Sequence, residues 1–299
     1  MITSLDPSSE LFLTNVNRIQ DRIAEASRQV SSGRKIAQPS DAPDQIDGLL
    51  QLRADRERNE QIQANLSLEL TRVQTADGTL SSAIKLMDRA RALAAQGATA
   101  TATSSGRQAM ADEVQSLLNE MVSCSRTAVQ GRFIFSGDAD TTPPYQADPA
   151  SPNGVDLLVG AAATRLVQDP AGGSFPAAKT AREIFDRPGA SVFGALNFLH
   201  AALLGGDPAT IAQAAASADT ASIQLNSAQA FYGNVQGRIT DAQGFAERYD
   251  TQLQTQLSQM QDADVAAAAV TLTQANTQLQ AAFQMRAAMP HKSLFDFIG

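Results

Sequence analysis

The distribution of proline constrains the fold of this 299-residue chain more than any other feature. No proline stands between Pro43 and Pro143 or between Pro208 and Pro290, whereas eight of the twelve prolines lie from Pro143 to Pro208. Because a proline inside a helix costs about 3 kcal/mol, the two proline-free stretches are free to form long helices. The sequence therefore predicts helical ends and an irregular middle.

Apolar residues near the N-terminus recur alternately four and three positions apart. The series runs Phe12, Val16, Ile19, Ile23, Ala26 and Val30. This is heptad spacing, which predicts a helix that packs along a partner helix. The stretch Ser31-Ser32-Gly33 that follows is a typical helix terminus.

The same spacing predicts further helices on both sides of the middle region. One begins after Pro43 and fades at Gly97, and another covers 110–128. After the middle region the spacing returns over 232–253 and over 265–282, with the acidic residues Asp262 and Asp264 between the two segments. The last segment carries Val265, Leu272 and Leu279 at heptad positions.

These patterns predict a mainly α protein in which both chain ends form a long antiparallel helical rod, with a small β-containing insert at its far tip. The insert is expected to cover about 138–195. Within the insert, 156–159 and 165–168 are short apolar runs of strand length, bounded by turn residues.

Composition excludes several classes of function. The net charge of −8 and the pI near 4.8 argue against binding to nucleic acid, which needs a basic face. The sequence contains no run of about 18 apolar residues, so no membrane span is predicted. Residues 1–7 lack the cationic start and apolar core of a cleaved secretory signal, so none is expected.

No set of residues predicts catalysis or metal binding. His200 has a helical context without a nearby metal-ligating partner, and His291 lies beside Pro290, so surface positions are the simpler interpretation for both. The single cysteine, Cys124, falls in a heptad series, where a thiol acts as a small apolar group. The pair Asp138 and Asp140 lacks the remaining spacing of a calcium loop. We expect no enzyme activity, no cofactor and no metal.

Several motifs carry a family resemblance. The stretch 131–137, Gly-Arg-Phe-Ile-Phe-Ser-Gly, resembles a motif of the hook–filament junction proteins of bacterial flagella (hook-associated protein 3), which belong to the flagellin family. The segments 32–36 and 39–43 resemble the exit of their first helix, and 293–298 is similar to their apolar C-terminal signature. The segment 89–96 is shared more broadly with flagellins. The motif residues of interest are Gly131, Arg132, Phe133, Phe135 and Gly137.

The resemblance implies a structural subunit that is exported unfolded through the flagellar type III channel to the extracellular flagellum. It also implies three parts: an inner terminal coiled coil from 1–42 with 257–299, a helical rod from 43–137 with 196–256, and an outer β-containing insert from 138–195. It implies a ring or helical homo-oligomer between another hook-associated protein and the flagellin filament, and an export chaperone before secretion. Two alternatives stay open: a flagellin filament subunit, and a soluble coiled-coil adaptor that stays in the cell.

Under this interpretation the assembly contacts lie on the two heptad series and on the apolar C-terminal tip. The predicted interface residues are Phe12, Val16, Ile19, Ile23, Val30, Val265, Leu272, Leu279, Leu294, Phe295, Phe297 and Ile298.

Overall fold

The structure, a computed structural model, describes residues 7–160 and 165–288 and divides into two compact units. The first unit contains 1–58 and 250–299, and the second contains 59–249. Two long helices, α2 (Ile46–Gly97) and α6 (Pro208–Gln261), contribute residues to both units. The three-part division expected from the sequence stays a prediction.

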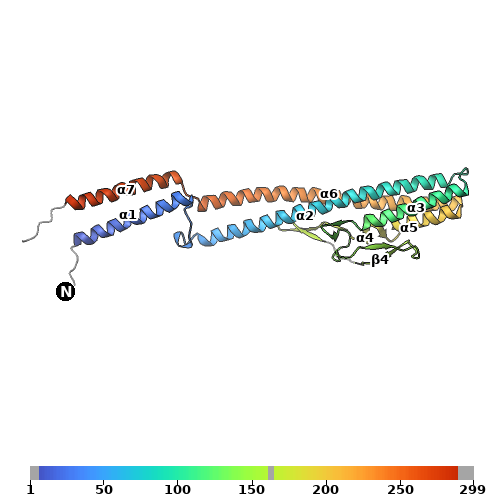
Figure 1. Ribbon diagram of the computed structural model, residues 1–299, viewed down its shortest axis with the longest axis horizontal. Coiled ribbons are helices and arrows are strands. Elements are labelled where there is room, and N and C mark those ends of the chain that lie inside the picture. Colours follow the sequence, from blue (N-terminus) through green and yellow to red (C-terminus); the bar gives the residue numbers. More distant parts are fainter. Residues whose placement is uncertain (1–6, 161–164, 289–299) are drawn as a thin grey trace, which may run out of the picture. The chain divides into compact units, whose positions relative to one another are not determined.

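In the first unit, α1 (Pro7–Ser32) packs against α7 (Val265–Ala288) in antiparallel orientation (Figure 1). The predicted pairing of the two terminal helices is thereby confirmed. Near one end Arg286 donates a hydrogen bond to Ser9, and near the other end Arg34 forms a β-bridge with Asp262. The 3-10 turn η1 (Pro39–Asp41) lies between α1 and α2.

The two connections of this unit are joined by backbone hydrogen bonds. The amides of Lys35 and Ile36 donate to the carbonyl of Gln261 over 2.7 and 3.3 Å, and the amide of Ala263 donates to the carbonyl of Gly33 over 2.9 Å. Gly33 has a φ of +67°, which a side chain would disfavour, so glycine suits this helix exit. The links α1–α2 and α6–α7 are therefore held side by side.

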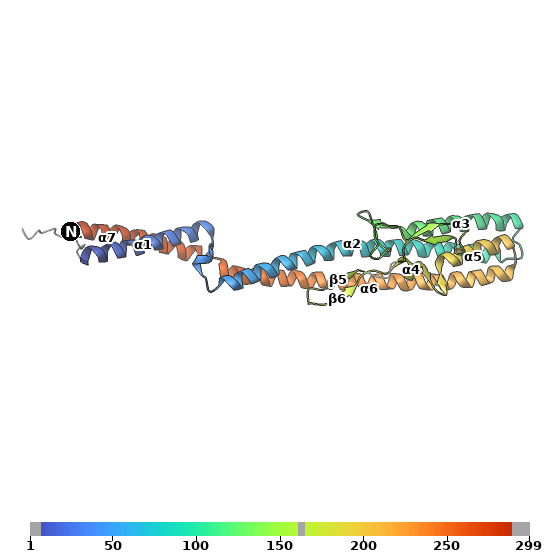
Figure 2. The same ribbon diagram turned by 90° about the horizontal axis from the view of Figure 1, so that it is seen from below.

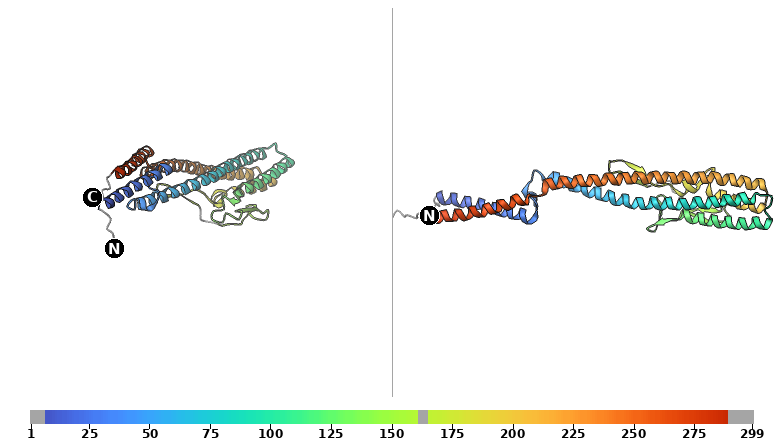
Figure 3. Two further views of the ribbon diagram at one scale, coloured as in Figure 1. Left: turned by 60° about the vertical axis from the view of Figure 1, so that its left-hand side comes forward. Right: turned by 90° about the horizontal axis from the view of Figure 1, so that it is seen from above.

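The second unit is built on the remaining parts of α2 and α6, with α3 (Ser104–Ser125) and α5 (Val192–Gly205) packed against each other. Figure 3 shows these helices running side by side. The α2 series that the sequence predicts is buried here: Leu66, Leu80 and Met87 have no exposed surface. From α6, Ile239 is likewise fully buried and Tyr232 is 2% exposed. Heptad spacing thus predicted the core-facing side of both long helices.

The end of α3 differs from the prediction. The apolar spacing continues to Ala128, but the helix ends at Ser125 and Ala128 belongs to β1 (Ala128–Val129), which pairs with β2 (Arg132–Phe133). The two residues between these strands, Gln130 and Gly131, have φ values of +53° and +75°. This left-handed two-residue turn reverses the chain, so the helix cannot continue through Ala128.

Three further antiparallel hairpins lie in the middle region, in agreement with a small insert of short strands. They are β3 (Tyr145–Ala147) with β4 (Val155–Leu157), β5 (Leu166–Gln168) with β6 (Ser174–Pro176), and β7 (Asp186–Arg187) with β8 (Ala190–Ser191). The strands expected within 156–159 and 165–168 correspond to β4 and β5. The short helix α4 (Ala181–Phe185) precedes β7.

The expected position of the insert at the far tip is wrong. Its hairpins lie against the sides of the helices, and the tip of this unit is formed by the α2–α3 and α5–α6 turns (Figure 2). The guanidinium of Arg238 in α6 lies 4.1 Å from the ring centre of Phe175 in β6, and Lys179 lies over Phe231. Apolar insert residues such as Tyr145 and Phe175 are buried in the same core as the helices, because two-stranded hairpins cannot bury them alone.

Candidate assembly interface

The contact between α1 and α7 is narrow and rich in alanine. Val16, Ile19 and Ala26 are buried on α1, and Ala268 and Ala275 are buried on α7. Small side chains let two helices approach closely, but they remove little apolar surface from water. The pair is therefore a marginal structure that gains from further contacts.

The structure brings most of the predicted heptad residues of this unit to the contact. Half-buried positions on the two helices are Phe12, Ile23, Val30, Leu272 and Leu279. Val265 departs from the predicted series, since it is 44% exposed. It is the first residue of α7, and the smaller Ala268, one turn later, takes the buried place.

Polar and aromatic groups close the outer end of the pair. Arg286 of α7 donates to the Ser9 hydroxyl over 2.9 Å, and its guanidinium lies 5.6 Å from the ring centre of Phe12. The rings of Phe12 and Phe283 meet edge to face. Between the helices runs a groove of about 420 Å³, whose lining combines Ile19 and Met285 with arginine side chains.

The faces flanking the contact carry large apolar side chains in water. The members of this exposed set are Leu11, Leu13, Val270, Phe283 and Met285, each between 48% and 67% exposed. Large exposed apolar patches mark interaction sites, so these side chains are candidates for contact with a partner.

The predicted apolar tip lies outside the described residues. Its members are Leu294, Phe295, Phe297 and Ile298. Their part in an interface stays a prediction.

The motif at 131–137 builds the interior of the second unit. Phe135 is fully buried, with its ring centre 5.7 Å from that of Phe185 and 6.3 Å from that of Tyr232. Phe133 pairs with Ala128 in the β1–β2 hairpin, and Gly137 has a φ of +62°. The motif therefore serves the packing of the insert against the helices.

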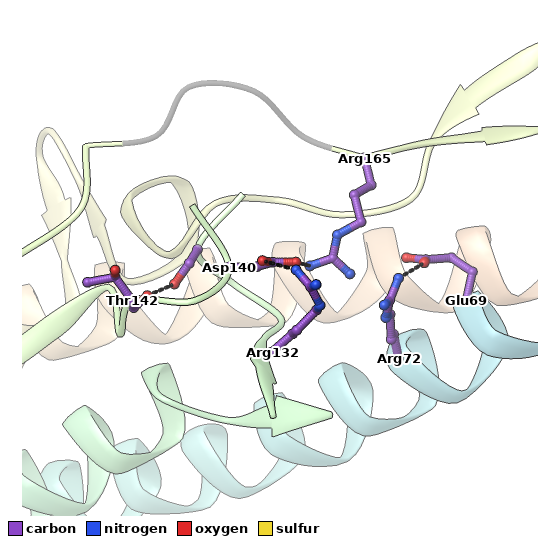
Figure 4. Close-up of polar contacts among 7 residues, drawn as sticks. Glu69, Arg72, Arg132, Asp140, Thr142 and Arg165 are labelled. Carbon is purple, nitrogen blue, oxygen red and sulfur yellow. Dashed lines mark hydrogen bonds and ion pairs between the residues drawn. The ribbon is translucent and has the colours of Figure 1, made fainter. Parts of the chain in front are cut away.

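Charged groups beside this motif form a cluster that sequence analysis missed (Figure 4). Arg132 donates to the Asp140 carboxylate over 2.7 Å, and Arg165 points to the same carboxylate with Nη2 4.0 Å from Oδ2. Next to them Arg72 pairs with Glu69 over 3.0 Å. Asp140 and Arg165 lie far apart in the sequence, and no local spacing could have paired them.

The groups considered for catalysis have ordinary surroundings. Burial raises the pKa of the Cys124 thiol, and the nearby Glu120 charge acts in the same direction, so the thiolate is disfavoured. His200 is half-buried on α5. Within the ranges that the structure describes, no group of three or more His, Cys, Asp or Glu side chains could hold a metal ion. No helix in these ranges is long and apolar enough to cross a bilayer.

Similar folds occur among flagellar proteins. A protein from Vibrio parahaemolyticus assigned as a flagellar hook-associated protein has a TM-score of 0.66 at 21% identity, over 74% of this chain and 100% of its own. Hook associated protein-3 from Legionella pneumophila scores 0.63 at 14% identity, over 72% and 99%. FlgL from Xanthomonas campestris scores 0.60 at 16% identity, over 69% and 98%. At these identities the likeness concerns the fold.

Sequence comparison identifies the family directly. No curated protein matches the chain. The bacterial flagellin N-terminal helical region matches residues 8–140, and the bacterial flagellin C-terminal helical region matches residues 215–298. These two regions account for both helical ends and for the motif at 131–137, and the chain belongs to the bacterial flagellin family.

Proposed function

We propose that this protein is a structural subunit of the bacterial flagellum that joins the hook, through another hook-associated protein, to the flagellin filament. The observation that carries the proposal is the apolar surface of the α1–α7 pair. Leu11 and Leu13 on α1 flank the contact with α7, and Phe283 and Met285 are exposed on α7. Exposed apolar surface of this kind is typical of protein–protein contacts, and neighbouring subunits would remove it from water.

The arrangement suits a helical or ring-shaped homo-oligomer. Side chains on two flanks of one helix pair can contact different neighbours, and such head-to-tail contacts build rings or open filaments. The alanine-rich α1–α7 contact supplies little apolar burial, so neighbouring copies would complete its core. Membership of the flagellin family supports assembly with other flagellar components.

A junction role is preferred over a filament role on two grounds. The motif at 131–137 resembles that of the hook–filament junction proteins, and the structurally similar proteins from Legionella and Vibrio carry hook-associated names. The export chaperone, the flagellin contact and secretion without a cleaved signal are part of this proposal. The apolar tip at 294–298 is proposed to bind the chaperone first and neighbouring subunits later. No enzyme activity is part of the role.

The junction, filament and adaptor roles predict different copy numbers of the protein in isolated flagella and different locations for it. A junction protein is present in isolated flagella in few copies, a filament subunit in thousands, and an intracellular adaptor not at all. Quantitative immunoblotting of isolated flagella together with immunogold labelling therefore tests the proposal. A band confined to the cell fraction would overturn the flagellar role, and filament-wide labelling would replace the junction role by that of a filament subunit.

A matched pair of variants tests whether the exposed apolar surface of the α1–α7 pair serves assembly. Leu13→Asp places a negative charge on the exposed apolar flank. The control Thr14→Asp places the same charge at the next residue, where the native threonine hydroxyl donates to the Glu10 carbonyl of its own helix. Both variants should keep the helicity of the purified chain, because both side chains are exposed. Leu13→Asp should abolish incorporation into flagella and motility, and Thr14→Asp should not. Equal incorporation of both variants would contradict an assembly role for this flank.

A further inference from the structure

The β7–β8 hairpin lies over α6 with a hollow on each side. Its turn is Pro188–Gly189, where Gly189 has a φ of +82°, and Arg187 pairs with Ala190. Figure 2 shows the neighbouring α4 and α5 beside α6. We call the hairpin and its two hollows the hairpin surface. Its exposed members are Arg182, Glu183, Arg187, Phe198, Thr220 and Ile223, and Lys179 is half-buried beside them.

The first hollow, of about 440 Å³, is cationic. Lys179, Arg182 and Arg187 line it together with Gln224 of α6. One carboxylate, that of Glu183, is also present, but it accepts hydrogen bonds from the Thr180 amide and hydroxyl over 2.8 and 3.0 Å. These bonds cap α4 through the Oε2 atom of Glu183, and the hollow thus contains three cationic side chains and one carboxylate.

Neutral groups hold two of these cations in place. Arg187 donates through Nη1 to Gln224 Oε1 over 3.3 Å, and Gln224, only 7% exposed, donates in turn to the Glu183 carbonyl over 2.7 Å. The Lys179 ammonium lies 4.8 Å from the ring centre of Phe231. Among the described residues, none of the three cations forms an ion pair with a carboxylate, unlike Arg89 and Arg132 elsewhere in the unit. Three positive charges against the single carboxylate of Glu183 leave the hollow net cationic.

The second hollow, of about 400 Å³, is lined by small residues and Phe198, which is 37% exposed. It lies against Ala216 and Thr220 of α6. Ile223, one turn after Thr220 and directly before Gln224, is 70% exposed. An apolar patch thus adjoins the cationic hollow on the same stretch of α6. A free anion would contact only the cationic hollow. A protein surface can contact both the cationic hollow and the apolar patch beside it.

We propose that the hairpin surface contacts a second copy of this chain in the assembly, and that its cationic hollow receives a carboxylate of that copy. Charge favours this occupant: the chain carries 31 acidic and 23 basic residues, so another copy presents an excess of carboxylates. Arginine pairs with carboxylates through two parallel hydrogen bonds, which fixes orientation as well as proximity. The inference rests on the proposed function, because it needs neighbouring copies.

Photo-crosslinking in isolated flagella tests this contact. The photoreactive residue p-benzoylphenylalanine replaces Ile223, whose side chain is exposed and does not support the core. Irradiation should give a product of two copies of this chain, with the crosslinked peptide of the second copy containing Asp or Glu. In the Arg182→Glu and Arg187→Glu double variant the yield should fall at least tenfold. The matched control Lys85→Glu, an exposed cation outside the surface, should leave the yield unchanged.

The outcomes separate the inference from the proposed function. If the chain is absent from isolated flagella, the proposed function fails before the contact is tested. If it is present but gives no two-copy product, or crosslinks only to another protein, the second copy is the wrong occupant. If the product forms equally in the double variant, the carboxylate contact is wrong. Circular dichroism of the purified double variant must match that of the unaltered chain, and a lower yield from a folded variant supports the contact.

Discussion

Phe12 of α1 and Phe283 of α7 meet edge to face, with ring centres 6.2 Å apart and ring planes inclined by 70°. The two residues come from opposite ends of the chain, and their contact holds the outer end of the terminal helix pair. Edge-to-face aromatic pairs contribute about 0.5–1.5 kcal/mol beyond the area they bury.

A double-mutant cycle of Phe12→Ala and Phe283→Ala should therefore give a coupling free energy of about 1 kcal/mol. Chemical denaturation, followed by a fluorescent probe attached to the first unit, measures it. Phe12→Ala should lower the free energy of unfolding more than Phe283→Ala, since Phe12 is half-buried and Phe283 is 52% exposed. A coupling near zero would mean that the rings do not support the pair in solution.

Asp140→Asn should destabilise the second unit by about 1–3 kcal/mol, because the half-buried guanidinium of Arg165 loses its counter-charge. Arg165 Nη2 is buried without a hydrogen-bond partner and has the Asp140 carboxylate as its nearby anion. Arg132→Gln removes the exposed partner of the same carboxylate and should cost about 1 kcal/mol or less. Urea denaturation of both variants measures which one loses more free energy of unfolding. An equal loss in both would contradict the idea that Arg165 depends on the Asp140 charge.

Two glycines of α2 should respond in opposite directions to alanine. Gly78 has open space where a Cβ would be added, so Gly78→Ala should stabilise the helix by about 0.5–1 kcal/mol. At Gly97 the added Cβ would clash with the Cδ2 atom of Leu203, which is 1% exposed and has little room to move. Gly97→Ala should therefore lower the free energy of unfolding by about 1–3 kcal/mol. Thermal and urea unfolding of the two variants give the signs directly.

Alkaline pH should destabilise the second unit through its buried tyrosines. Burial raises the pKa of Tyr232 well above its ordinary value of 10.0, and burial followed by the Asp186 charge does the same for Tyr145. The stability that neutral tyrosine provides is fully present below pH 10 and is lost as the pH rises toward the folded-state pKa, because only the unfolded chain ionises there.

Tyr232→Phe should remove one such contribution, so the variant should lose about 1.4 kcal/mol less stability than the unaltered chain between pH 9 and pH 11. At neutral pH Tyr232→Phe should lower the free energy of unfolding by about 1 kcal/mol, because it removes the hydroxyl that accepts a hydrogen bond from the Lys179 amide. Urea denaturation across this pH range gives both values. Parallel pH profiles for the two proteins would show that Tyr232 does not govern the alkaline loss.

The sequence by itself determined the helical elements and their buried sides. Absence of proline and heptad spacing are local properties, and they predicted α1, α2 and α7 over most of their length, together with buried positions such as Val16, Leu80 and Ile239. Of α6 (Pro208–Gln261) the spacing predicted only 232–253. The same local properties also predicted which two helices pair at the chain ends, since each carries a stripe too poor in large side chains to be stable alone.

Only the tertiary structure decided where the insert lies and which charged groups meet. Asp140 and Arg165 come together because the hairpins fold back onto the helices to bury Tyr145 and Phe175. Likewise Lys179 and Arg187 reach one hollow through their contacts with α6, at Phe231 and Gln224. These contacts join segments far apart in the chain and depend on packing against a shared core, which residue spacing along the sequence does not encode.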